Sequence, residues 1–160
     1  MAAPKRKAPA SHSISKPVDR PLFDDFLPHL IARLAYQLNI DLVEKLKREG
    51  INVTRWRILA VLAMGDGIAI SDIIDRAMVQ QSALSRALMR MEKENFVRRS
   101  LRRDDARCVE VYLTEKGRSL FNSLNIVVRR REQRLLEGFS PKQIEAAFAL
   151  VRRLSRNMRT

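Results

Sequence analysis

The 160-residue chain is poor in cysteine, histidine and glycine, and each shortage argues against a class of function. Its one cysteine, Cys108, has no second cysteine for an intramolecular disulfide, a usage typical of the reducing cytoplasm. Its two histidines, His12 and His29, have no clustered partner for catalysis or for zinc. Its five glycines build no phosphate-binding loop. We therefore expect no enzyme, no metal site and no cofactor.

Long apolar runs are missing as well. No uninterrupted apolar segment reaches the length of roughly 18 residues that a membrane-spanning helix needs. The first residues carry Lys5, Arg6 and Lys7, but the continuous apolar stretch of a secretory signal does not follow them. The sequence therefore predicts a cytoplasmic protein with no membrane partner.

Acidic residues are few beside the basic ones: 18 Asp and Glu stand against 31 Lys and Arg, which gives a formal net charge of +13. Such an excess favours a polyanionic partner, because cations that contact phosphates release condensed counterions. A protein on an anionic membrane surface would carry the same charge, so the charge alone does not identify the partner. The 46% hydrophobic content is ordinary for a globular protein.

The first 21 residues differ in composition from the rest. They are rich in Ala, Pro, Ser and Lys and hold almost nothing to bury, which predicts a disordered basic arm. This arm either lies along DNA phosphates or is merely solvated, and the sequence leaves both open. Residues 22–160 are predicted to form a single domain, with a central lobe at about 51–113 and outer helices at 22–50 and 114–160.

Helical periodicity begins after the arm. From Leu27 to Lys47 apolar residues recur at three- and four-residue steps, which predicts an amphipathic helix that Gly50 ends. Thr54 and Ser71 are expected to cap two shorter helices.

A fourth helix is predicted from about Gln81 to Glu94. Leu84, Leu88 and Met91 mark its inward face, and Asn95 can adopt the left-handed conformation with which helices often end. Short helices joined by tight turns suggest a helix-turn-helix.

The apolar period changes from helical to two after Asn95. Alternation over Val97–Leu101 and again over Val109–Leu113 predicts two strands of a β-hairpin with a charged tip at residues 103–107. Thr114 is then expected to cap a long helix that runs to Gly138.

The start of the last helix is clearly signalled. Ser140 is the expected N-cap, Pro141 suits the first helical position, and Gln143 completes a capping box. The fold class is therefore mainly α with a small β-hairpin.

The order of these elements, and the residues at the hairpin, resemble the multiple antibiotic resistance regulator (MarR) family of transcription factors over about residues 27–157. The resemblance is carried by LSRALMRMEK at 84–93, FVRR at 96–99, DAR at 105–107 and LTEKG at 113–117. The chain departs from the family at Gln80, where a small N-capping residue is usual, and at Asn95, where glycine is usual.

The resemblance implies a winged helix-turn-helix that binds double-stranded DNA. The polar face of the fourth helix is then the reading face, with Gln81, Ser82 and Arg86 on base edges and Ser85 and Arg90 beside them. A polar face on an amphipathic helix is more often simply solvated, but the neighbouring hairpin favours DNA.

The hairpin would be the wing. It concentrates positive charge, and its candidate DNA-binding residues are Arg99, Arg102, Arg103, Asp105 and Arg107. In the family the tip enters the minor groove, so Arg107 is the candidate inserted cation with Asp105 steadying its guanidinium. The alternative is that Asp105 and Arg107 form only a turn pair.

The resemblance also implies a homodimer and a small-molecule effector. Apolar residues on the first and last helices need cover, which either a second copy or the same chain supplies. Candidate effector-binding residues are His29, Arg33, Tyr36 and Trp56, for an aromatic acid or its coenzyme A thioester. An exposed arginine and half-buried aromatics are at least as ordinary an interpretation.

Two other classes fit the charge. A non-specific architectural nucleic-acid-binding protein, without an effector, needs the positive charge but not the ordered helix and wing. A basic helical protein that docks an acidic protein partner would bind no DNA. The preferred prediction is a dimeric repressor that an effector releases from a pseudo-palindromic operator.

Overall fold

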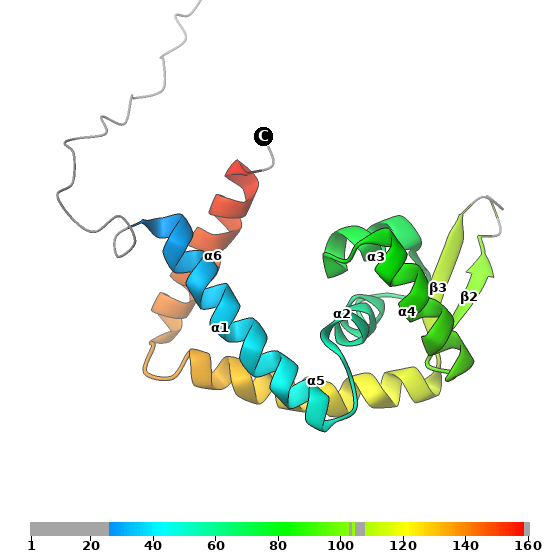
Figure 1. Cartoon of the computed structure of the whole chain (residues 1–160). Coiled ribbons are helices and arrows are strands. Elements are labelled where there is room, and N and C mark those ends of the chain that lie inside the picture. Colours follow the sequence, from blue (N-terminus) through cyan, green and yellow to red (C-terminus); the bar gives the residue numbers. More distant parts are fainter. Residues whose placement is uncertain (1–25, 103, 105–107, 159–160) are drawn as a thin grey trace, which may run out of the picture. The chain divides into compact units, whose positions relative to one another are not determined.

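The computed structural model describes residues 26–102, 104 and 108–158 (Figure 1), and the predicted basic arm at 1–21 lies outside them. The chain divides into two units, Met1–Leu38 and Asn39–Thr160. The elements are α1 Leu27–Arg48, α2 Val53–Leu62, β1 Ile68–Ala69, α3 Ile70–Ala77, α4 Gln81–Lys93, β2 Val97–Leu101, β3 Val109–Leu113, α5 Glu115–Leu135 and α6 Pro141–Asn157. This is the predicted fold class, mainly α with a small antiparallel wing. No helix in the described ranges has the length and apolar character to cross a membrane.

The caps of two short helices differ from the prediction. Asn52, not Thr54, caps α2: it is extended, and its side-chain oxygen accepts a hydrogen bond from Arg55 N at 2.8 Å. Ser71 lies inside α3, whose N-cap position is Ala69 with no side-chain hydrogen bond. The physical reason is that Ala69 still belongs to β1, so the chain passes from strand to helix without an intervening polar residue.

The sheet has three strands in the order β1-β3-β2, all antiparallel. The predicted hairpin strands are confirmed, with Val97 opposite Leu113 and Leu101 opposite Val109. Strand β1 is not among the predicted elements, because two residues are too few to show an alternating pattern. It pairs Ile68 with Val111 and places the turn before α3 against the wing.

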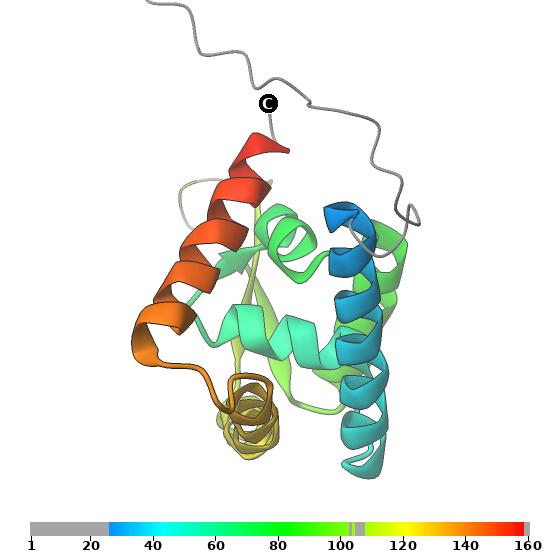
Figure 2. The ribbon, with the colours of Figure 1, turned by 90° about the vertical axis from the view of Figure 1, so that its left-hand side faces the viewer.

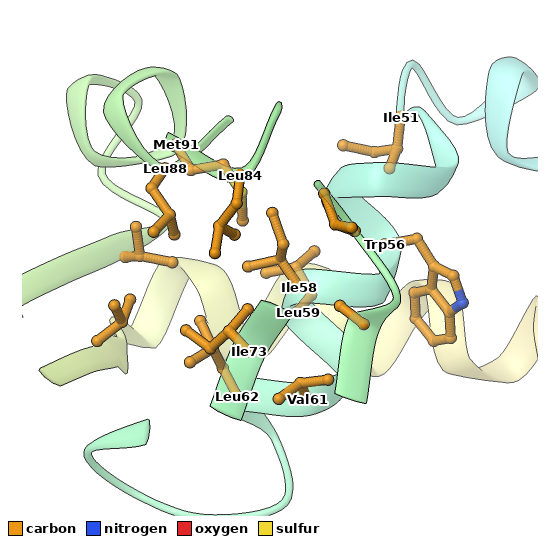
Figure 3. Close-up of a cluster of buried hydrophobic side chains, with 14 of the residues drawn as sticks. Ile51, Trp56, Ile58, Leu59, Val61, Leu62, Ile73, Leu84, Leu88 and Met91 are labelled. Atoms are coloured by element: carbon orange, nitrogen blue, oxygen red, sulfur yellow. The ribbon is translucent and has the colours of Figure 1, made fainter. Parts of the chain in front are cut away.

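The core of the second unit lies where α2, α3 and α4 meet (Figure 3). Ile58, Leu59 and Leu62 of α2 and Ile73 of α3 are almost fully buried. The predicted inward face of α4 is confirmed, since Leu84, Leu88 and Met91 are at most 2% exposed. Burying this stripe fixes the rotation of α4, so its opposite face must point away from the core.

The end of α4 is tied to the start of α5. Asn95 takes the expected left-handed conformation, with φ 60°, and turns the chain into β2. Thr114 caps α5 as predicted, because its Oγ1 accepts from Gly117 N at 3.0 Å, and that hydroxyl donates to the Asn95 carbonyl at 2.7 Å. The end of α4 is thus anchored to the start of α5.

The last helix follows a turn at the end of α5 (Figure 2). Its predicted capping box is confirmed: Ser140 Oγ accepts from Gln143 N, and Gln143 Oε1 accepts from Ser140 N at 2.9 Å. Helix α6 has no buried residue, and Phe148, Leu150 and Val151 are each between 45% and 59% exposed. These three apolar side chains therefore remain largely uncovered.

Candidate nucleic-acid interface

The outward face of α4 carries the residues that the sequence singled out. Gln81, Ser82, Ser85, Arg86 and Arg90 are all exposed. Ser82, Arg86 and Arg90 follow one another at steps of four, so they form one stripe along the helix. This stripe offers hydroxyl and guanidinium groups, which can donate to base acceptors and to phosphates.

Glu94 engages two arginines near the end of this stripe. Its Oε1 lies 3.3 Å from Arg90 Nε in an ion pair, but the Arg90 side chain remains 76% exposed. Its Oε2 pairs with Nη2 of Arg55 from α2, whose side chain is only 12% exposed. The bond from Arg55 is the main reason that the pKa of Glu94 lies below its ordinary value. Arg55 therefore holds Glu94, while the Arg90 side chain remains largely open to solvent.

An ion pair between Glu92 and Arg99 joins α4 to β2. Arg99 Nε donates to Glu92 Oε2 at 2.8 Å, and the Arg99 backbone N–H donates to Glu92 Oε1 at 3.2 Å. The hydrogen bonds from Arg99 lower the pKa of Glu92, and the same pairing raises the pKa of Arg99. The Arg99 guanidinium is thus partly occupied by its bonds to Glu92, though the Arg99 side chain is still 40% exposed. The pairing helps to set the direction in which β2 leaves α4.

The wing holds the remaining candidates. Arg102 Nε donates to Glu110 Oε1 at 2.7 Å, and Arg102 N donates to the Cys108 carbonyl at 2.9 Å. The pKa of Glu110 is lowered first by the hydrogen bond from Arg102 and then by one from Tyr112. The other three wing candidates, Arg103, Asp105 and Arg107, lie outside the described residues.

Neither Arg98 nor Tyr112 is among the site residues that the sequence predicts. The guanidinium carbon of Arg98 lies 4.0 Å from the centroid of the Tyr112 ring. These residues face each other across the β2–β3 pair. The pairing of an arginine with an aromatic residue follows from the strand register, once both ends of the hairpin are fixed.

The four candidate effector residues lie in both units. In the first unit Arg33 and Tyr36 are exposed on α1 and His29 is half-buried. In the second unit Trp56 is buried, and its ring stacks on Phe121 with centroids 5.6 Å apart. That stacking covers one face of the indole, so a ligand ring must use another edge or displace Phe121.

A cavity of about 690 Å³ lies beside the start of α2. None of the four predicted effector residues lines it. Its cationic lining comes from Lys47, Arg55 and Arg90. No sequence pattern signals this cavity, because its walls come from three segments whose approach depends on tertiary packing.

Comparison with known proteins supports the DNA-binding interpretation. The MarR family model matches residues 51–109, which cover α2 to the start of β3. The transcriptional repressor IacR of Pseudomonas putida is 25% identical over 99% of this chain and 94% of its own length. The homoprotocatechuate degradative operon repressor of Escherichia coli is 30% identical over 64% of this chain, which spans 63% of that protein.

Solved structures of known regulators share this fold. A MarR family transcriptional regulator from Silicibacter pomeroyi superposes with a TM-score of 0.76 at 30% identity, over 82% of this chain and 89% of that one. Regulators of this family are not enzymes, which confirms the expectation that the chain is not one. The chain belongs to the MarR family of winged helix-turn-helix, DNA-binding transcription regulators.

Proposed function

We propose that this protein represses transcription by binding a pseudo-palindromic operator as a homodimer and that a small aromatic or carboxylated effector releases it. One observation carries the DNA-reading half: the polar stripe of α4 is turned outward by a fully buried opposite face. Two relatives, from Pseudomonas putida and Escherichia coli, are named as repressors, which supports the direction of the effect.

Within this proposal Gln81, Ser82 and Arg86 read base edges, since they are exposed and lie in the first half of α4. Ser85 and Arg90 contact bases or phosphates beside them. In the wing, Arg99 and Arg102 contact phosphates, and Arg107 enters the minor groove with Asp105 and Arg103 beside it. Phosphate contacts fix register and orientation, whereas base contacts determine which sequence is preferred.

The proposed partner across the dimer is a second copy of this chain. Uncovered apolar side chains lie on both terminal helices: Leu27, Leu30, Ile31 and Leu34 on α1, and Phe148, Leu150 and Val151 on α6. Burying a large apolar side chain contributes about 1.5–3 kcal/mol. Replacing Phe148 by Glu should therefore yield monomers in analytical ultracentrifugation, whereas a Lys142→Ala variant should sediment like the parent.

The proposed effector is an aromatic acid or its coenzyme A thioester. On α1, Arg33 can pair with a carboxylate, and Tyr36, which is 67% exposed, can contact an aromatic ring. The ligand must bind more tightly to a dimer whose reading helices are wrongly spaced for the operator, because only differential affinity shifts an equilibrium. Calorimetry that detects no binding of aromatic acids or their thioesters would remove this half of the proposal.

The test of the DNA-reading half is selection of binding sites from random duplexes, followed by binding measurements with Arg86→Ala. We expect a two-fold symmetric consensus in the selected duplexes and, in the variant, a smaller ratio between affinities for selected and scrambled duplexes. Lys142→Ala, on α6, removes one exposed positive charge elsewhere and should leave that ratio unchanged. An architectural protein would give no consensus and nearly equal affinities, which would refute the proposal.

A further inference from the structure

Four side chains on one face of the wing form a continuous chain of contacts. Arg98 stacks over the Tyr112 ring at 4.0 Å. The Tyr112 hydroxyl donates to Glu110 Oε2 at 2.8 Å. Arg102 Nε donates to Glu110 Oε1 at 2.7 Å. Because Arg98 and Arg102 are four residues apart along the first arm of the wing, their side chains share a face of it.

The ring of Tyr112 packs closely against a glycine, Gly67. Gly67, in the turn before β1, has φ +72°, and a Cβ there would meet the Tyr112 hydroxyl at 2.8 Å and its ring carbon Cζ at 3.0 Å. A side chain at this position would therefore push the ring away. The close approach of Gly67 places Tyr112 where it can contact Arg98 and Glu110 together.

Glu110 is a carboxylate within a surface otherwise dominated by arginine. Against a polyanion, a carboxylate near the contact surface lowers affinity by simple repulsion. Yet both Glu110 oxygens accept strong hydrogen bonds, and its side chain is only 16% exposed. Its contacts therefore help to restrict the rotamers of Arg102 and Tyr112. Ordering a long side chain before binding reduces the entropy cost of binding.

We propose that Glu110 and Tyr112 are positioning residues that hold Arg102 and Arg98 in the orientation in which they contact backbone phosphates of the operator. This inference rests on the proposed DNA binding. Glu110 acts on Arg102 directly and on Arg98 through the Tyr112 ring. We therefore expect that removing the negative charge of Glu110 weakens DNA binding.

The experiment measures binding of the full chain to a selected operator duplex by fluorescence anisotropy, at several salt concentrations. For Glu110→Gln we expect roughly three- to tenfold weaker binding, because the neutral amide holds Arg102 less firmly and ordering one long side chain on binding lowers affinity by about this factor. The slope of log affinity against log salt should fall by up to about 0.9 for each phosphate that a wing no longer neutralises. Circular dichroism and thermal unfolding will show whether the variant is folded, and a structural role alone would not reduce the salt slope.

Two further variants separate the explanations. Asp75→Asn removes an exposed carboxylate from α3 and should bind at least as tightly as the parent. In the Arg102→Ala background, Glu110→Gln should weaken binding less than it does in the parent, because the arginine that Glu110 positions directly is gone and only its effect on Arg98 remains. Unchanged or tighter binding by Glu110→Gln, or an equal weakening in both backgrounds, would overturn the inference. A parent that prefers no duplex sequence would instead refute the proposed function itself.

Discussion

Gly117, in the first turn of α5, gives the sharpest stability prediction, because its surroundings reverse the usual effect of Gly→Ala. In an exposed helix interior, alanine in place of glycine stabilises by about 1 kcal/mol. Here a Cβ would lie 3.0 Å from the carbonyl carbon of Phe96 and closer still to its oxygen, a distance that real Cβ atoms do not tolerate. The obstacle is backbone, so it cannot rotate away.

Relieving the clash requires the start of α5 to move away from the end of α4. That movement strains the Thr114 N–H bond to the Phe96 carbonyl at 3.2 Å and the Thr114 hydroxyl bond to the Asn95 carbonyl at 2.7 Å. Overpacking of a buried site costs about 1–3 kcal/mol, and each strained hydrogen bond contributes about 1 kcal/mol. After the gain in helix propensity, we expect Gly117→Ala to lower the free energy of unfolding by about 2 kcal/mol.

Urea unfolding followed by far-ultraviolet circular dichroism measures this change as a lower midpoint with an unchanged slope. The matched control is Ser119→Ala, an exposed position in the same helix, which should raise the midpoint slightly because alanine is the better helix former. If Gly117→Ala proves as stable as the parent or more stable, the close packing between α5 and the turn after α4 is not as the structure shows.

For three other substitutions the structure determines the direction of the change in stability. Met78→Gly should raise the free energy of unfolding by about 0.5–1 kcal/mol in thermal unfolding, since Met78 has φ 51° and is 75% exposed; a decrease would contradict this. Ser140→Ala should lower it by about 1 kcal/mol, because α6 loses its capping box, and an unchanged melting temperature would count against that role. Glu92→Gln should make the free energy of unfolding less sensitive to acid, because pairing with Arg99 lowers the folded-state pKa of Glu92. The stabilisation from this ion pair is fully present above the ordinary pKa of 4.5 and is lost as the pH falls through the lowered pKa of the folded state. Urea midpoints of parent and variant that fall in parallel from neutral pH to about pH 3 would contradict this reason.

Long elements are well predicted from the sequence because their apolar residues repeat many times. Helix α4 shows this, since three buried residues at helical spacing determine both its extent and its outward face. The predicted cap of α2 is wrong because Asn52 and Thr54 can both cap, and backbone conformation, which no local pattern reveals, selects between them. Strand β1 exists only through its pairing with β3.

The candidate site divides in the same way. Exposure of Gln81, Ser82 and Arg86 follows directly from the helical period, so it is predictable. The ion pair between Arg99 and Glu92 is not predictable, because the two residues are seven positions apart and a residue with left-handed backbone, Asn95, lies between them. Side-chain pairs of this kind depend on the angle at which strand and helix meet.

Sequence reading by the outward face of α4 is the central claim. Its most direct test is the ratio of affinities for a selected pseudo-palindromic duplex and a scrambled duplex of equal length, measured at one salt concentration with the full chain. We expect a ratio of at least about 10³ for the parent, which Arg86→Ala reduces. Nearly equal affinities in the parent, or a ratio that Arg86→Ala leaves unchanged, would contradict it.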